Sequence, residues 1–220
     1  MIISFPTIDC TIDTTYCAAE LIVENQSALL SILDDLSSQV EGNDGKAVLS
    51  RNNSILTISK NLELITSFTP FSVNRKNLVN RLVLRLIEES VCESMYESTI
   101  ELRSQIEEYG FRLASGLSGS IEFRNCTIEM LIKGMSPYFE DSHKLLIEKL
   151  SDYFDLVRDY KHDKLFVLYN FRSLVSDEDF SKLADDIKKK SIEALFIESF
   201  ERARIEAVNR IIVDKDLCVI

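Results

Sequence analysis

The chain of 220 residues contains only six glycines and three prolines. Flexible and extended linkers are rich in these residue types, so their scarcity argues against long disordered linkers. No run of about 18 apolar residues occurs, so no membrane-spanning helix is expected. The opening MIISFPTIDCTID has neither a basic region nor a small-residue cleavage site. We therefore expect a cytoplasmic protein without a membrane partner.

Cysteine and histidine are too few and too scattered for common metal or catalytic sites. The cysteines are Cys10, Cys17, Cys92, Cys126 and Cys218. No C-x-x-C pair occurs among them, so neither a zinc ribbon nor a thioredoxin-type site is indicated. Their odd number leaves one unpaired in any disulfide scheme, and we expect free thiols in a reducing compartment. The only histidines, His143 and His162, have no evident partners for a triad or a metal site.

The motifs of common enzyme classes are missing as well. A phosphate-binding loop requires G-x-x-x-x-G-K-[ST], whose amides and lysine hold the phosphates of a nucleotide. The nearest match, residues 42–46 (GNDGK), has the wrong glycine spacing and lacks Ser or Thr after the lysine. It also precedes a predicted strand, whereas the motif precedes a helix. Neither G-x-S-x-G nor H-E-x-x-H occurs. We therefore predict no bound nucleotide and no catalytic activity.

Hydrophobic patterning predicts strands around one helix in the N-terminal third. Short runs of β-branched and aliphatic residues predict strands at residues 1–5, 18–24, 46–50, 54–60 and 62–68. Leucine and isoleucine at helical spacing predict a helix over residues 26–39, followed by a turn at 41–45.

After Pro70 the pattern becomes helical. Apolar residues at steps of three and four predict long helices from residue 73 to about 109, and further helices at 127–135 and 142–157. Gly110, Gly116 and Gly119 are predicted to interrupt them, with a loop at 115–120.

The C-terminal part returns to alternating elements. Strands are predicted at residues 164–170, 192–199 and 209–214, and Ser176 with Asp179 forms a capping box at the start of a helix. Two nearly continuous apolar runs joined by this helix fit a buried parallel βαβ unit. We therefore predict an α/β domain made of residues 1–70 and 141–220. Residues 71–140 are predicted to be an inserted helical domain.

The formal net charge is -11, yet bases gather on one predicted helix. Arg75, Lys76, Arg81 and Arg85 precede its first acid, Glu88. Local potential acts over a Debye length of about 8–10 Å, so such a cluster can attract a polyanion despite the negative total. Arg81 and Arg85 stand one turn apart and can follow a phosphate backbone. No aromatic residue interleaves with them, which favours double-stranded DNA over stacked single strands.

Other base clusters have structural explanations. Lys188, Lys189 and Lys190 close a predicted helix, where cations offset the dipole, and they form the second candidate DNA surface. The arginines of residues 202–210 interleave with acids and are expected on a mixed surface. For Arg85, the alternative to DNA is pairing with Glu88 or Glu89 on the same helix.

Oxygen ligands also gather before one helix. Glu122, Asn125 and Glu129 bracket its start and could hold calcium, which prefers carboxylate and amide oxygens. The alternative is a capped helix start, at which acids are favoured by the dipole.

Several segments, taken in order, resemble the Csn-two family of type II-A CRISPR systems. The opening MIISFPTID resembles that family's first strand, and residues 62–89 resemble its strand, Val-Asn turn and L-x-x-x-L-x-x-x-L-E helix. TIEMLIKGM is similar to its T-I-x-x-L-I-K helix. Residues 142–187, 193–199 and 211–220 resemble the later helices and the last two strands.

This resemblance implies an α/β domain related to P-loop kinases but without the phosphate loop. It also implies a helical insertion and a ring-shaped homotetramer. Family members bind double-stranded DNA without sequence readout, prefer free ends, depend on calcium and work beside the spacer integrase and the effector nuclease. The family's calcium ligands precede its T-I-x-x-L-I-K helix. Here Glu122 remains, whereas Arg124 and Asn125 replace acids.

We therefore expect a non-catalytic DNA-binding protein of CRISPR spacer acquisition. One alternative is an acidic cytoplasmic regulatory or scaffold protein that binds other proteins through its helical domain. A degenerate nucleotide kinase is the third possibility.

Overall fold

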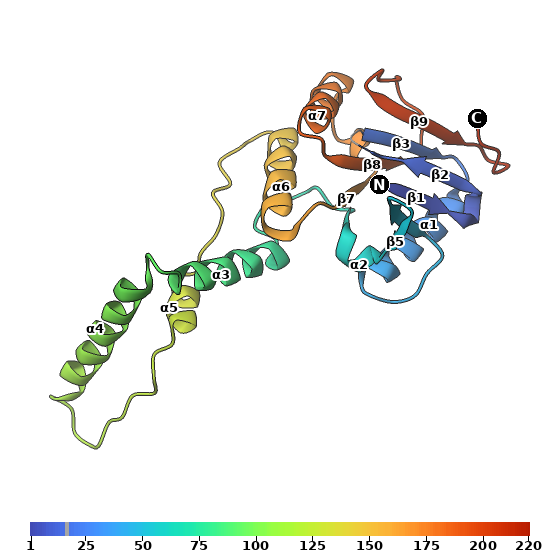
Figure 1. The fold of residues 1–220 in the computed structure, drawn as a ribbon. Helices are drawn as coiled ribbons and strands as arrows, with labels where there is room; N and C mark the ends of the chain where they lie inside the picture. The colour runs from blue at the N-terminus through green and yellow to red at the C-terminus, as the bar shows by residue number, and fades with distance from the viewer. Residues whose placement is uncertain (16–17) are drawn as a thin grey trace. The chain divides into compact units, whose positions relative to one another are not determined.

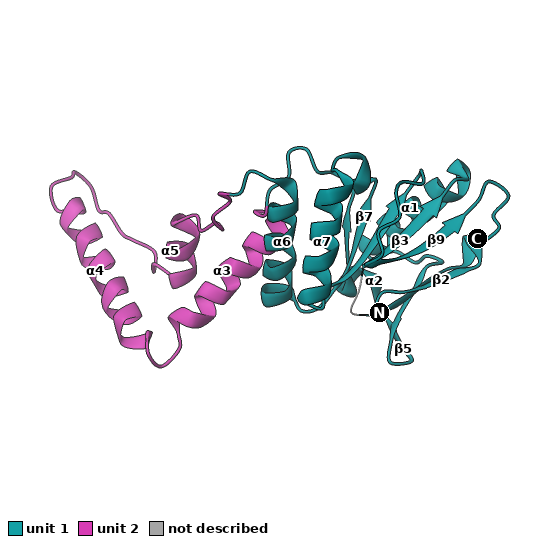
Figure 2. Cartoon of the chain, turned by 90° about the horizontal axis from the view of Figure 1, so that it is seen from above, with its two compact units in different colours: residues 1–72, 143–220 teal, residues 73–142 magenta. Residues whose placement is uncertain are grey.

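The computed structural model describes residues 1–15 and 18–220, and Cys17 therefore lies outside the described residues. The chain divides into two compact units (Figure 2). Unit 1 comprises Met1–Ser72 and His143–Ile220, and unit 2 comprises Val73–Ser142. The boundaries predicted from the sequence, 70/71 and 140/141, lie within two residues of these. No described helix is long and apolar enough to cross a membrane.

The centre of unit 1 is a parallel sheet, in the order β6-β7-β8-β3-β9 over the described residues (Figure 1). Its strands are β3 (Ala18–Val23), β6 (Leu62–Ile65), β7 (Leu165–Tyr169), β8 (Glu193–Glu198) and β9 (Val208–Val213). All residues of β3 and β8 are buried, as expected for apolar strands covered on both faces. The predicted parallel βαβ unit is confirmed, because Val167 of β7 lies opposite Leu195 of β8. Unit 1 is thus an α/β domain, whereas its likeness to nucleotide kinases stays a prediction.

Helices pack on both faces of this sheet. They are α1 (Gln26–Val40), α6 (Leu146–Lys161) and α7 (Asp177–Lys189). Successive side chains of a strand point to opposite faces. Leu195 and Ile197 of β8 therefore join the core cluster that contains the buried face of α1. Phe196, between them, contacts Phe180 of α7, with ring centroids 4.8 Å apart.

A smaller antiparallel sheet, in the order β2-β1-β4-β5, completes unit 1. It contains β1 (Ile2–Phe5), β2 (Cys10–Asp13), β4 (Val48–Arg51) and β5 (Ser54–Leu56), and the short helix η1 (Pro6–Ile8) joins the first two strands. The strand predicted at residues 54–60 is too long. The backbone turns after Leu56 into α2 (Ile58–Asn61), since this turn places Ile58 in the core at 4% exposure.

Unit 2 consists of α3 (Lys76–Ser90), α4 (Tyr96–Ala114) and α5 (Ile128–Gly134) with their connections. Helix α3 packs against α5. The segment after α4 folds back onto it, because Arg103 Nε donates to the Cys126 carbonyl at 3.0 Å. The rings of Phe111 and Phe123 also meet, with centroids 5.7 Å apart.

One predicted helix break in unit 2 is wrong. Gly110 lies inside α4, which continues to Ala114. A single glycine costs a helix only about 1 kcal/mol, so it does not by itself end one. The helix ends just before the glycine- and serine-rich residues 115–120, where the loop was predicted.

Candidate nucleic-acid interface

Helix α3 separates an apolar side from a basic one. Leu78 is buried, while the side chains of Lys76, Arg81 and Arg85 are exposed. Within the described part of the chain, neither Lys76 nor Arg81 forms an ion pair. Three of the bases predicted from the sequence are therefore exposed on one helix, and two of them carry charge that no acid neutralises.

The start of α3 has an unusual charge for a helix. Arg75 is its N-cap residue and Lys76 its first helical residue, and the first turn contains no acid. Arg75 is half-buried, and its side chain does not cap the helix. A helix N-terminus carries about half a positive charge, so bases there destabilise the helix and an anion stabilises it. This end of α3 is electrostatically suited to a phosphate group.

Arg85 is partly engaged within its own helix. Its Nη2 lies 3.0 Å from Glu89 Oε1, and its Nη1 lies 3.9 Å from Glu88 Oε2. These are the pairs predicted from the sequence as the alternative to DNA contact. All three side chains are more than half exposed, so each pair contributes only about 0.2–0.5 kcal/mol and can be exchanged for another anion.

The three lysines at the end of α7 do not form one surface. Lys188 and Lys189 are exposed. Lys190 instead lies 2.7 Å from Asp155 of α6 and 3.0 Å from Asp186 of α7. Burial alone would lower the pKa of Lys190, but hydrogen bonds to these carboxylates outweigh burial and raise it. Lys190 thus joins α6 to α7, which leaves Lys188 and Lys189 as the exposed part of this candidate.

The candidate calcium ligands are not preorganised for a cation. Glu122 and Asn125 are exposed, and Glu129 pairs with Lys133 at 2.6 Å. Among residues 1–15 and 18–220, no group of three or more His, Cys, Asp or Glu side chains is placed to hold a metal ion. Thr127 caps α5 by accepting the Met130 N–H at 3.2 Å, as expected for a capped helix start. The residues in their present positions do not fit a calcium site, and calcium binding stays a prediction.

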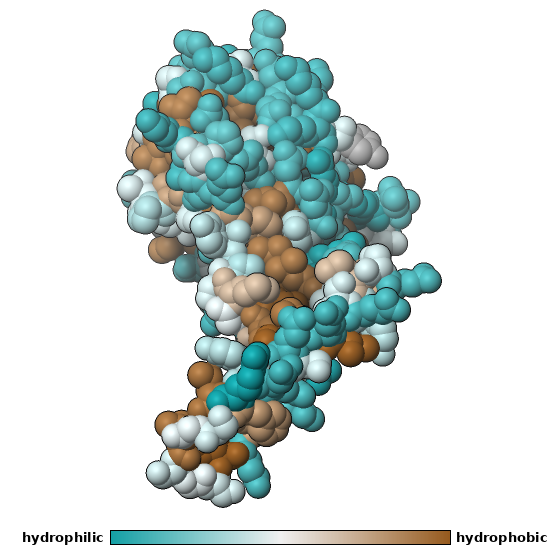
Figure 3. All heavy atoms as spheres, turned by 90° about the vertical axis from the view of Figure 1, so that its left-hand side faces the viewer, coloured by the Kyte–Doolittle hydropathy of each residue, from teal (hydrophilic) through white to brown (hydrophobic). Residues whose placement is uncertain are grey.

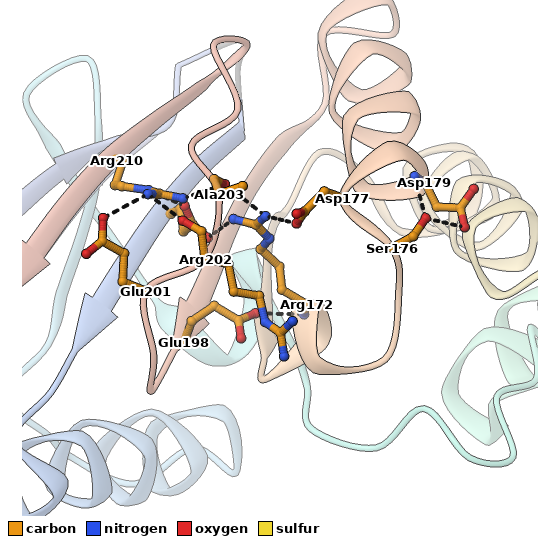
Figure 4. Close-up of polar contacts among 10 residues, drawn as sticks. Arg172, Ser176, Asp177, Asp179, Glu198, Glu201, Arg202, Ala203 and Arg210 are labelled. Carbon is orange, nitrogen blue, oxygen red and sulfur yellow. Dashed lines mark hydrogen bonds and ion pairs between the residues drawn. The ribbon is translucent and has the colours of Figure 1, made fainter.

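Unit 1 contains a buried charge network that the sequence analysis missed (Figure 4). Arg172, in the short helix η2 (Phe171–Ser173), is 1% exposed and lies 2.7 Å from Glu20 of β3. It also pairs with Asp177 at the start of α7. Arg210 of β9 lies 2.7 Å from the other oxygen of Glu20. The expectation that Arg210 lies on a mixed surface is wrong, since its side chain is 6% exposed.

Glu198, at the end of β8, lies beside this network. It is 2% exposed and accepts the Arg172 backbone N–H at 3.0 Å. Burial raises the pKa of Glu198 to about 7, and the nearby Glu20 charge acts in the same direction, while the Arg172 backbone N–H lowers it. The sequence signal for this network was a glutamate within each of two buried apolar runs, since such acids are rarely buried without partners.

Comparison with known proteins agrees with this architecture. A solved structure, "Crystal structure of Stu0660 of Streptococcus thermophilus", aligns with a TM-score of 0.56 and 15% identity, over 91% of this chain and 69% of that one. At this identity the likeness shows the fold alone. The curated proteins gave no match. A family model described as CRISPR-associated protein (Cas_Csn2) matches residues 39–217, which is most of the chain. The chain therefore belongs to the CRISPR-associated Csn-two family.

Proposed function

We propose that this protein binds double-stranded DNA, and its free ends in particular, during CRISPR spacer acquisition in the cytoplasm. In this proposal it acts without catalysis and without reading sequence, as a homotetrameric ring. Family membership supports the CRISPR association. The observation that carries DNA binding is the start of α3, where the exposed Lys76 occupies the positive end of a helix with no acid in its first turn.

The spacing of bases on α3 suits a phosphate backbone. Arg81 and Arg85 are four residues apart, which is about one turn and about 6 Å along a helix axis. These two side chains can therefore contact neighbouring phosphates, and the backbone amides at the N-terminus with the Lys76 ammonium can bind a further phosphate. Such contacts carry no sequence information, so binding is expected to be sequence-independent and strongly dependent on salt.

Self-assembly is supported by the apolar surface of unit 2. Every described residue of α4 is at least partly exposed, including Tyr109 at 57%, Phe111 at 60% and Leu113 at 57%. Apolar side chains are visible on this surface in Figure 3. Large exposed apolar patches mark contact sites between proteins. A ring would cover such patches and gather the basic α3 helices of several copies, while acidic residues outside keep it soluble.

The remaining partners follow from the family resemblance. The protein would act beside the spacer integrase and the effector nuclease. A calcium requirement would need Glu122 and Asn125 to rearrange or a second copy to add ligands, because Glu129 is paired with Lys133.

Competition between DNA forms tests the proposal. Linear duplex should compete for binding better than closed circular duplex, because a ring admits DNA by its end. Light scattering should give about four times the monomer mass of 25.2 kDa. Equal competition by both forms would count against the ring. Failure to shift linear duplex would favour the scaffold alternative, and binding of ATP in a titration would favour the kinase alternative.

Charge-reversing substitutions test which residues contact DNA. The double variant Arg81→Glu, Arg85→Glu should abolish DNA binding and leave the oligomeric mass unchanged, since both side chains are exposed. The matched double variant Lys188→Glu, Lys189→Glu should bind as the unmodified protein does. The reverse outcome would move the DNA surface to α7.

A further inference from the structure

Helix α3 buries one side and exposes the other. Leu78 is buried, Leu82 and Leu86 are half-buried, and the helix packs against α5. Over residues 76–85 the exposed side chains are Lys76, Asn77, Asn80, Arg81, Leu84 and Arg85. This exposed side contains basic residues and no acid, although acids outnumber basic residues in the whole chain by 36 to 25.

The basic residues lie along both edges of this exposed side, and its centre is neutral. Successive residues of an α-helix are about 100° apart around the helix axis. Measured from Lys76, the others lie at about 40° for Asn80, about 80° for Leu84, about 100° for Asn77, about 140° for Arg81 and about 180° for Arg85. Lys76 therefore forms one edge, and the two arginines form the other. Leu84 and Asn77 lie between these edges.

This order distinguishes two ways in which a helix can bind a duplex. A helix that lies along one phosphate backbone needs its basic residues at the centre of the face that makes contact. A helix that lies in a groove has phosphates on both sides and the edges of base pairs in the middle. It therefore needs basic residues along both edges of its face and uncharged residues between them. Helix α3 has the second arrangement.

The two central side chains suit the edges of base pairs. Leu84 is 49% exposed, and an apolar side chain gains nothing from a phosphate, whereas the thymine methyl group offers an apolar contact in the major groove. The exposed Asn77 amide carries both donors and an acceptor, so it can meet any base pair with little preference. Contact in the groove is therefore compatible with sequence-independent binding.

The dimensions of this side suit the major groove of B-form DNA. Residues 76–85 extend about 14 Å along the axis, and a helix about 10–12 Å across fits a groove about 12 Å wide. Glu88 and Glu89 follow and pair with Arg85, so Arg81 carries most of the free charge on its edge. Helices that read the major groove insert their N-terminal part, which leaves these two acids outside the groove.

We propose that α3 inserts its N-terminal part into the major groove of B-form DNA. Leu84 and Asn77 then face the base pairs, while Lys76 contacts the phosphates of one strand and Arg81 those of the other. This inference rests on the proposed binding of DNA by α3, and adds the groove and the form of the duplex. The major groove of A-form RNA is deep and narrow, so double-stranded RNA is excluded.

Competition between modified duplexes tests the groove. Linear duplex DNA should displace labelled DNA at least about tenfold better than duplex RNA of the same length and sequence. Duplex DNA whose cytosines all carry a glucosylated hydroxymethyl group has a filled major groove and an unchanged charge. It should bind at least about tenfold more weakly than unmodified DNA. Netropsin, which occupies the minor groove, should leave binding unchanged.

Leu84→Arg distinguishes a groove from a backbone contact. In the major groove an arginine binds the edge of guanine, so this variant should bind a G·C-rich duplex about tenfold more tightly than an A·T-rich one. The matched control is Leu30→Arg, because Leu30 is 59% exposed on α1 of unit 1 and receives the same charge. The control should show no such preference. Circular dichroism checks that both variants are folded.

Three results would overturn this inference. They are equal competition by duplex RNA, equal binding of the glucosylated duplex, and a Leu84→Arg variant that binds both DNA compositions equally. The first two use the unmodified protein and do not depend on the folding of a variant. Each of the three would leave DNA binding itself in place. Failure of the unmodified protein to bind any linear duplex DNA would contradict the proposed function as well.

Discussion

Helices α7 and α3 each carry a cluster of bases, but at opposite ends. In α7, Ser176 caps the start, acids fill the first turn, and Lys188 and Lys189 lie in the last turn. This arrangement complements the helix dipole at both ends. In α3 the bases begin at the start, with Arg75 and Lys76, and acids come at the end, with Glu88 and Glu89. The charges of α7 stabilise the fold, whereas the Lys76 charge in the first turn of α3 opposes it.

The same contrast extends to the two units. In unit 1, Arg172 and Arg210 are buried and paired with Glu20, so they have a structural role. In unit 2, Lys76, Arg81 and Arg85 of α3 are exposed, and Lys76 and Arg81 are among described residues without an ion pair. The stability of the fold does not explain a base that lowers the stability of its own helix and has no acid partner. Binding of a polyanion explains it.

The largest expected effect concerns the buried network. Arg172→Met should lower the free energy of unfolding by about 3–5 kcal/mol, because it leaves the buried Glu20 carboxylate with one partner fewer. Arg81→Ala should change it by no more than about 0.5 kcal/mol. Urea unfolding followed by circular dichroism measures both, since the chain has no tryptophan to report by fluorescence. Equal effects of the two substitutions would remove the contrast between the units.

A second expected effect concerns the pH dependence of unit 1. Burial raises the pKa of Glu198 from 4.5 to about 7, so the folded state holds this proton more tightly than the unfolded state. The resulting stability is complete below about pH 4.5 and is lost as the pH rises through about 7. Glu198→Gln removes this loss, so its stability relative to the unmodified protein should rise by up to about 3 kcal/mol between pH 4.5 and 8.

The control for this measurement is Glu201→Gln. Glu201 is 59% exposed, so the variant should follow the pH dependence of the unmodified protein. A Glu198→Gln variant whose advantage does not grow with pH would show that Glu198 is ionised in the folded protein throughout this range.

A third, smaller effect separates the lysines of α7. Lys190→Ala should lower the free energy of unfolding by about 1–2 kcal/mol, because Asp155 and Asp186 then face each other without a cation between them. Lys188→Ala is the matched control, with an expected change within about 0.5 kcal/mol. Thermal unfolding measures the difference. Equal loss from both variants would mean that the dipole, and not the link to α6, determines the contribution of these lysines.

Patterns within short stretches of sequence predicted those features that depend on residues close together in the chain. The helix at residues 26–39 and the βαβ unit were predictable from apolar periodicity. The pairing of Arg85 with Glu89 was foreseen as an alternative because the two residues are four apart. The network of Glu20 was missed, because its partner Arg172 lies 152 residues away and no local pattern relates them. The strand predicted at 54–60 ends at Leu56, because the core contact of Ile58 overrode the β propensity of the residues that follow.

Lys76→Glu tests the central claim most directly, because stability and DNA affinity should change in opposite directions. An acid at the first position of α3 interacts favourably with the positive end of the helix dipole and should stabilise the protein by about 0.3–1 kcal/mol. The same change should weaken duplex binding and reduce the slope of log affinity against log salt by about one or more. Lys188→Glu, in the last turn of α7, should lower the stability of the protein slightly and leave DNA binding unchanged. A Lys76→Glu variant that is less stable and binds DNA with unchanged affinity and salt slope would contradict the account.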